Sequence, residues 1–324
     1  MLTISVMIPT YHRPQDLARC LSALETQNRQ ADEIVVVVRD TDVETWQFLH
    51  EFDASRLPLR QVTVTVPGQV AALNAGLCAV QGDIIAITDD DAAPNSDWLE
   101  RIEAHFLADD RVGGVGGRDI IQTNEPWNQR EQQTVGKLTW YGKIIGNHHI
   151  GIGFAREVDI LKGVNMSYRR SALIDHAFDS QLLGIGAQVH NEVAFCLALR
   201  KMQWTLIYDP AILVDHYSAP RFDEDQRHQF NAIAHANAAH NETLALLKNL
   251  PFVQRCIFLV WAVLVGTSQA FGLVQWLRYL PSQGTVATQK LGATLQGRWQ
   301  GLVTWLQTKN QPVNRASDRA EETS

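Results

Sequence analysis

Short β-branched segments alternate with helical segments over residues 1–90 of this chain. Residues 33–38, Glu-Ile-Val-Val-Val-Val, are too short and too rich in β-branched side chains to be anything other than a central strand. Because the alternation implies right-handed crossovers, it predicts an α/β fold with a largely parallel sheet and ligands at the carboxyl ends of its strands. The other elements predicted here are strands over residues 2–8, 59–66 and 83–88 and helices over residues 15–26, 41–52 and 70–79.

The composition is that of a globular protein, and it limits the classes of partner that we expect. Of the 324 residues, 45% are hydrophobic, enough for one large domain with an appendage or for two small domains. The formal net charge is −7 and no basic stripe is present, so nucleic acid is not an expected partner. The four cysteines are too widely spaced for a disulfide scaffold or a metal knuckle, and the N-terminus lacks a basic leader, which predicts a reducing, cytoplasmic location.

Three adjacent carboxylates, Asp89, Asp90 and Asp91, directly follow the strand predicted over residues 83–88. Like charges this close together repel one another, so a cation is expected beside them. Oxygen ligands of this kind suit Mg²⁺ or Mn²⁺. The alternative is a solvated acidic loop that caps the following helix, and the residues alone leave both interpretations open.

The middle of the chain has less regular patterns. The glycines of residues 112–120 lack the spacing of a phosphate-binding loop, and we interpret them as bends at a strand edge rather than as a nucleotide site. Residues 122–153 show no sustained period, which predicts a long loop that could close over a substrate as a lid. Beyond this loop, the predicted elements are strands over residues 162–170, 205–208 and 212–214 and a helix over residues 192–202.

The C-terminal part begins with an amphipathic pattern over residues 223–250. Its histidines, His228, His235 and His240, are spaced for a solvated helix surface rather than for one ligand set. Residues 256–277 contain no formal charge and would measure roughly 33 Å as one helix, enough to cross a bilayer.

Polar residues inside this apolar segment weaken the transmembrane prediction. A buried helix of a soluble domain and a helix lying in the membrane interface therefore stay open beside a spanning helix. We expect residues 251–281 to form the apolar segment as a whole. Residues 282–324 are expected to add an amphipathic surface within residues 291–307 and a disordered tail.

Five segments in one order resemble the family 2 glycosyltransferases. The resemblance covers roughly residues 3–220 and implies an inverting enzyme of the GT-A fold: a single Rossmann-like domain over residues 1–222 with a mostly parallel central sheet, followed by a C-terminal helical segment. The segments are SVMIPTYHRPQDLARCL (residues 5–21), LNAGLCAVQGDIIAITDDDAAPNSDWLE (73–100), GVNMSYRR (163–170), NEVAFCLALRKMQW (191–204) and VDHY (214–217).

The resemblance implies a divalent metal, Mn²⁺ or Mg²⁺, at the acidic triplet. Asp91 falls on the metal-binding position of the family's D-x-D pattern, while Asp89 faces the donor and is a second candidate ligand. His216 falls on the family's late histidine and is a third candidate ligand or a contact to the diphosphate, with a purely structural role as the alternative. A cation held there would neutralise charge on a departing diphosphate.

The nucleotide end of the donor pocket is assigned by the same resemblance. The family's acidic pair after the second strand is replaced by Val38-Arg39-Asp40, so either Arg39 or Asp40 takes the base-reading position. Asp40 is favoured because a carboxylate can accept a hydrogen bond from a uracil or guanine N–H. Leu73 stands where the family often has an arginine, so one phosphate contact is either missing or supplied from elsewhere, with Arg13 as a candidate. The expected donor contacts are Pro9, Thr10, Tyr11, Arg13, Asp40, Asn74, Asp89 and Asp90.

Glu192 falls on the position of the family's catalytic base. Where the family has a Glu-Asp pair at the start of a helix, this chain has Asn191-Glu192, so the carboxylate is one methylene longer. Deprotonating an acceptor hydroxyl is chemistry that either carboxylate can perform. The alternative is an ordinary acidic residue stabilised by the helix dipole.

These observations together predict a metal-dependent inverting glycosyltransferase that uses a nucleotide-diphosphate sugar. Its acceptor would be a glycan, a polysaccharide or a lipid-linked hydroxyl, and residues 256–277 would hold it at the inner face of the cell membrane. A sugar nucleotidyltransferase is disfavoured because PTYHRPQ lacks a glycine-rich basic loop. A catalytically degenerate nucleotide-sugar-binding scaffold is the other alternative, suggested by the departures at Asn191, Arg39 and Leu73.

Overall fold

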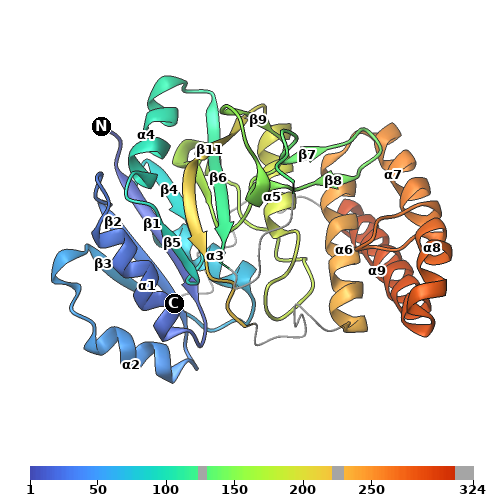
Figure 1. Cartoon of the computed structure of the whole chain (residues 1–324), viewed down its shortest axis with the longest axis horizontal. Helices are drawn as coiled ribbons and strands as arrows, with labels where there is room; N and C mark the ends of the chain where they lie inside the picture. The colour runs from blue at the N-terminus through green and yellow to red at the C-terminus, as the bar shows by residue number, and fades with distance from the viewer. Residues whose placement is uncertain (123–129, 221–229, 311–324) are drawn as a thin grey trace.

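The central sheet of the computed structural model contains nine strands within the described residues, which are 1–122, 130–220 and 230–310 (Figure 1). Six of them, β3, β2, β1, β4, β6 and β11, run in one direction, while β10, β5 and β9 run in the other. The predicted α/β fold with a mostly parallel sheet is therefore confirmed. Across the sheet the strands are β3 (Leu59–Val64), β2 (Glu33–Arg39), β1 (Ile4–Thr10), β4 (Ile84–Ile87), β10 (Met166–Arg169), β6 (Val112–Ile121), β11 (Thr205–His216) and β5 (Ala92–Pro94), with β9 (Arg156–Val158) also beside β11.

Helices cover both faces of this sheet, which is why its central strands are apolar on both sides. On β2, Ile34 and Val36 pack in one core while Val35 and Val37 pack in the other, as the two-residue period of a strand requires. The first core includes α1 (Pro14–Glu25), α2 (Val43–Glu51) and α4 (Trp98–Ala108), and the second includes α3 (Gln69–Ala79) and α5 (Asn191–Lys201). Short 3₁₀ turns lie at η1 (Ala54–Arg56), η2 (His148–Ile150) and η3 (Arg170–Leu173).

The strands predicted over residues 205–208 and 212–214 are one strand, β11. Its pairing with β6 is interrupted by an irregularity between Asp209 and Leu213, where polar and turn-forming residues mimic a strand end in the sequence. The continuous strand delivers His216 to the same edge of the sheet as the acidic triplet, because β11 runs parallel to β4.

The glycines of residues 112–120 lie inside β6, so their interpretation as bends at a strand edge is wrong. β6 is a central strand between β10 and β11, and its glycines allow neighbouring chains to approach closely. A Cβ on Gly117 would lie 1.9 Å from the carbonyl oxygen of Ile212, which is backbone and cannot rotate away.

Replacing Gly117 by Ala should therefore lower the free energy of unfolding by about 2–3 kcal/mol, because the backbone must shift to admit the methyl group. Urea denaturation would measure the loss. Gly163→Ala is the matched control, since a Cβ there meets nothing within 4 Å. An equal effect of the two substitutions would contradict the packing argument.

Four helices form the C-terminal part of the described chain, at the end of the molecule farthest from β3 (Figure 1). Arg298, only 3% exposed, donates to Glu242 Oε2 over 2.8 Å and joins the last helix to the first of the four. These helices are α6 (Ala232–Asn249), α7 (Phe252–Leu264), α8 (Leu273–Gln283) and α9 (Thr285–Asn310).

The apolar segment over residues 256–277 is not one helix, so that prediction is wrong. Helix α7 ends at Leu264 and α8 begins at Leu273, and the turn between them is closed by a backbone bridge between Gly266 and Phe271. Gly266 has φ +70°, and a Cβ there would lie 2.2 Å from the amide nitrogen of Gly272, so only glycine fits. Within the described ranges, no helix is both long enough and apolar enough to cross a membrane.

The histidines of α6 do not lie on a solvated surface, contrary to the prediction. His240 is buried and its Nε2 lies 3.0 Å from Thr304 Oγ1, while His235 Nε2 lies 2.9 Å from Thr294 Oγ1. Both threonines belong to α9, which packs against α6. The amphipathic pattern of α6 alone does not reveal this packing. His228 lies outside the described residues.

The loop predicted over residues 122–153 contains a small antiparallel hairpin formed by β7 (Lys137–Leu138) and β8 (Ile144–Ile145). Its tip packs on the C-terminal helices, where the rings of Tyr141 and Trp261 lie 5.1 Å apart. None of its described residues lines the cavity at the sheet edge, so the structure does not place this part as a lid. Residues 123–129 are outside the described part.

Candidate active site

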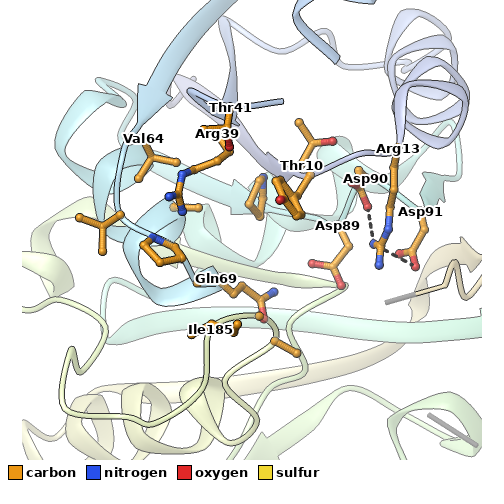
Figure 2. Close-up of a pocket in the computed structure, with 18 residues that line it drawn as sticks. Thr10, Arg13, Arg39, Thr41, Val64, Gln69, Asp89, Asp90, Asp91 and Ile185 are labelled. Atoms are coloured by element: carbon orange, nitrogen blue, oxygen red, sulfur yellow. Dashed lines mark hydrogen bonds and ion pairs between the residues drawn. The ribbon is translucent and has the colours of Figure 1, made fainter. Parts of the chain in front are cut away.

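A cavity of about 300 Å³ lies where the parallel strands β1, β2, β3 and β4 end. Its floor is formed by the segments that directly follow these strands, and the chain before α5 covers one side (Figure 2). The residues that line it are Pro9, Thr10, Tyr11, Arg13, Arg39, Thr41, Val64, Val66, Pro67, Gly68, Gln69, Ala72, Asp89, Asp90, Asp91, Ile185, Gly186 and Ala187.

The acidic triplet lies on the wall of this cavity rather than in a solvated loop. Asp91 is 1% exposed and Asp90 is 2% exposed. Burial and the negative charge of Asp91 raise the pKa of Asp89 to about 6. Burial likewise raises the pKa of Asp90 to about 7, although the charge of Arg13 opposes the rise. Burial thus makes ionisation of Asp89 and Asp90 costly, and positive groups beside them reduce this cost.

Arg13 links the segment after β1 to the triplet. Its Nη1 donates to Asp90 Oδ1 over 2.9 Å and lies 3.8 Å from Asp91 Oδ2 (Figure 2). Its Nη2 donates to the carbonyl of Pro220 over 2.7 Å, which ties the chain beyond β11 to the same point. The guanidinium is thereby held at the cavity, where it can also face an anionic ligand.

His216 joins the triplet from the end of β11. Its Nε2 lies 3.4 Å from Asp91 Oδ1, and its Nδ1 lies 3.5 Å from Asp119 Oδ2. Burial opposes protonation, but the bonds to Asp119 and Asp91 and the nearby negative charges raise the pKa of His216 to about 9. The hydrogen bond and charge of His216 in turn outweigh burial and lower the pKa of Asp91 to about 2.

Two functional neighbours, Asp119 and Lys162, are missing from the sequence prediction. Asp119 is fully buried on β6 and accepts a short hydrogen bond from Lys162 Nζ. The pair fixes the carboxylate that holds His216. Asp119 lies within residues 112–120, whose glycines led us to consider only backbone bends. No local signal connects its carboxylate to a lysine 43 positions away.

A prediction follows for the metal-free protein from the raised pKa of His216. A histidine whose folded pKa, about 9, exceeds its ordinary 6.5 adds stability that is fully present below pH 6.5 and is lost as the pH rises through 9. His216→Gln should therefore destabilise more at pH 6 than at pH 10, by roughly 2–3 kcal/mol in the free energy of unfolding. Denaturant titrations at both pH values would measure this. A pH-independent effect of His216→Gln would contradict the assignment.

The chain before α5 is anchored to the first turn of α3. The amide of Gln69 donates to the carbonyl of Gly186 over 2.8 Å, and the amide of Val70 donates to Gln188 Oε1 over 2.9 Å. Asn191, the first residue of α5, donates to Gln69 Oε1 over 3.4 Å. Gln69 itself lines the cavity, so these contacts set the start of α5 beside it.

Glu192 lies in the first turn of α5 and is half-buried. Within the described part of the chain, its carboxylate makes no side-chain hydrogen bond or ion pair, and it does not itself line the cavity. Glu192 directly follows Asn191, whose side chain contacts Gln69 on the cavity wall.

Two expected donor contacts lie elsewhere. Asn74 does not line the cavity, because its side chain bonds both the amide and the carbonyl of Phe178 at 2.9 Å. Asp40 is exposed and pairs with Arg39 over 2.9 Å, and it is Arg39 that lines the cavity. Gln69, at the start of α3, and residues 185–187, in the chain before α5, were absent from the sequence prediction because they lie outside the segments that resemble the family.

Comparison with known proteins identifies the family. The family model described as "Glycosyl transferase family 2" matches residues 5–176. The chain is 34% identical over 125 residues to chondroitin synthase from Escherichia coli, a match that covers 38% of this chain and 18% of that protein. The matched stretch thus spans less than a fifth of that relative.

Solved structures share the fold over nearly the whole chain. The mannosyltransferase PcManGT from Pyrobaculum calidifontis, in complex with GDP-Man and Mn²⁺, has a TM-score of 0.57 and 17% identity, covering 95% of this chain and 88% of that one. TarS 1-349 from S. aureus, in complex with UDP-GlcNAc, has a TM-score of 0.59 and 13% identity, covering 94% and 92%. Both are glycosyltransferase-type α/β structures, so the expected GT-A fold is confirmed. Since the family model covers more than half of its residues, this chain belongs to glycosyl transferase family 2.

Proposed function

We propose that this chain is a metal-dependent inverting glycosyltransferase that moves a sugar from a nucleotide-diphosphate donor to an acceptor hydroxyl. The observation that carries the proposal is the buried acidic triplet on a cavity at the carboxyl ends of the parallel strands, with Arg13 and His216 beside it. A donor diphosphate is anionic and needs both a cation and a positive side chain. The positively charged guanidinium groups of Arg13 and Arg39 would contact the phosphates and the nucleoside.

The residues present fit a divalent cation. Asp89 and Asp91 would be its carboxylate ligands and His216 a further one, an oxygen and nitrogen set that suits Mn²⁺. Within the residues that the structure describes, no three acidic, histidine or cysteine side chains form a complete metal cluster. Metals in nucleotide sites commonly take one or two carboxylates and complete their ligands with substrate phosphates. Bound in this way, the cation would stabilise charge on the leaving diphosphate.

Glu192 is the proposed base in a single displacement. Inversion requires a base that takes the acceptor proton on the face opposite the leaving group. Support comes from the first turn of α5, which is held beside the cavity through Asn191 and Gln69, and from a carboxylate that no described side chain engages. The negative charge of the Glu192 carboxylate is also stabilised by the N-terminus of α5.

The relatives support a proposal for the donor and acceptor classes. Structures with this fold hold GDP-Man with Mn²⁺ or UDP-GlcNAc, and the relative with the highest identity quoted above is named chondroitin synthase. We therefore propose a UDP- or GDP-linked sugar as donor and a glycan, polysaccharide or lipid-linked hydroxyl as acceptor. A cytoplasmic location at the inner face of the membrane accompanies this proposal.

The direct experiment offers purified protein a panel of UDP-, GDP- and dTDP-sugars with Mn²⁺ and measures release of the nucleoside diphosphate. The proposal predicts release from at least one donor and its loss on chelation by EDTA. Nucleotide-sugar binding without release, even when glycan acceptors are added, would instead indicate the catalytically degenerate scaffold. The scaffold is the second candidate because Arg39 and Asn191 each stand where the family has an acidic residue of a pair.

A further inference from the structure

Helix α7 presents an apolar stripe to solvent. Its exposed side chains follow one another at helical spacing, and none of them is charged or carries an amide or a hydroxyl. Phe252 is 74% exposed and Val260 60% exposed. The full stripe is Phe252, Val253, Cys256, Val260, Val263 and Leu264.

Helix α8 adds a second stripe of the same kind. Leu273, Val274 and Leu277 are exposed at positions i, i+1 and i+4. The bridge between Gly266 and Phe271 keeps α8 next to α7. We call the stripes of α7 and α8 together the α7–α8 apolar face. Exposed apolar surface of this extent on one pair of helices usually marks an interaction site.

Aromatic side chains accompany the face. Trp140, 66% exposed at the tip of the β7–β8 hairpin, packs edge-on against Tyr141, whose ring lies 5.1 Å from Trp261 of α7. Trp276 lies within α8. Tryptophan and tyrosine favour the boundary between water and lipid because their rings are apolar and their N–H and O–H groups are polar.

The chain segment that carries the face has no acidic residue. Although the whole chain has a net charge of −7, residues 243–317 contain no aspartate or glutamate. In the part of this segment that the structure describes, three cations make no ion pair and lie over aromatic rings instead: Arg255 over Trp305, Arg278 over Tyr279 and Lys290 over Phe271. Their charges are thus available to an anionic partner.

We propose that the α7–α8 apolar face docks onto the surface of an anionic lipid bilayer, with α7 and α8 lying in the interface rather than crossing it. Apolar side chains beside unpaired Arg and Lys are the composition of interfacial helices, whose cations meet lipid phosphates. A second copy packed face to face by a two-fold axis would bring the same cations together without any carboxylate between them. The surface therefore fits phosphate headgroups better than it fits itself.

The test is co-sedimentation of the full chain with vesicles, without donor or metal, so its result does not depend on transferase activity. The wild type should sediment with phosphatidylcholine–phosphatidylglycerol vesicles, and less with phosphatidylcholine alone or in high salt. The double variant Val260→Glu, Leu277→Glu should bind the anionic vesicles at least roughly tenfold more weakly. Its melting temperature verifies folding.

A matched control places the same charges on exposed aliphatic residues away from α7 and α8, in Val43→Glu, Ile174→Glu. This control should bind as the wild type does. The proposal is overturned if the wild type stays in the supernatant with anionic vesicles, or if both double variants lose binding equally. It is also overturned if gel filtration shows a wild-type dimer that only Val260→Glu, Leu277→Glu dissociates while vesicles are not bound.

Discussion

Replacing Asp91 by Asn should reduce sugar transfer by roughly 10²- to 10³-fold, because the change removes an anionic ligand where charge on the leaving diphosphate must be balanced. Asp91 is buried, lies on the cavity, and accepts the amide of Ala219 at Oδ2 over 2.9 Å. An asparagine can still accept this bond through its own oxygen, so the loop beyond β11 should keep its position. The measurement is the rate of nucleoside diphosphate release at saturating donor and Mn²⁺.

Asp97→Asn is the control for this substitution. Asp97 precedes α4, pairs with Arg101 and does not line the cavity. Its variant should transfer sugar at the wild-type rate. Equal activity of Asp91→Asn and the wild type, with both proteins folded, would remove Asp91 from the proposed site.

Replacing Glu192 by Gln should lower transfer by about 10²- to 10⁴-fold, the usual contribution of a general base. The amide keeps the size of the side chain but cannot take a proton from the acceptor. Because the proposed base acts on the acceptor, nucleotide affinity should stay at the wild-type value. Glu192→Asp, which restores the family's residue type, should keep part of the activity. Calorimetry with UDP or GDP and a transfer assay on the same preparations separate the two effects.

Glu44→Gln controls for the position of Glu192 in its helix. Glu44 is the second residue of α2, as Glu192 is the second residue of α5, so both carboxylates interact with a helix N-terminus. Both variants should lose a similar small amount of stability, but only Glu192→Gln should lose transfer. If transfer is unchanged in Glu192→Gln, or if nucleotide affinity falls as far as the rate, Glu192 is not the base.

The parallel half of the sheet could be predicted from the sequence because its signals are local. On β2, each apolar residue from Ile34 to Val38 packs into one of two cores, and a strand buried on both sides has no other composition. Ligand sites of parallel sheets lie at strand ends, so residues that directly follow strands, such as Arg13 and Asp91, could also be placed on one edge.

The rest of the site depends on contacts between distant segments. The pairing of Asp119 with Lys162 and His216 joins β6, the approach to β10 and the end of β11, and no spacing in the sequence reports it. Asn74 was expected at the donor from its motif, but the loop at Phe178 takes up its amide. The position of a residue in a motif therefore does not determine which group its side chain contacts.

The prediction of one helix over residues 256–277 is wrong because the backbone turns at Gly266. Hydropathy averaged over residues 256–277 describes one apolar segment, whereas Gly266 permits a left-handed turn and Gly272 admits its close approach. Thr267 reinforces the turn, since its amide donates to the carbonyl of Ala270 and its Oγ1 accepts the amide of Ala270. An average over side chains cannot report such a reversal, which here produces two short helices with exposed apolar stripes.

The acidic triplet is tested most directly by calorimetric titration of UDP and GDP into the wild type and Asp91→Asn, each with and without Mn²⁺. We expect Mn²⁺ to tighten binding of at least one nucleotide by roughly tenfold or more in the wild type and to have little effect in the variant. Nucleotide affinity that is independent of Mn²⁺ in the wild type, or equally dependent on it in both proteins, would show that the triplet does not hold a cation beside the nucleotide.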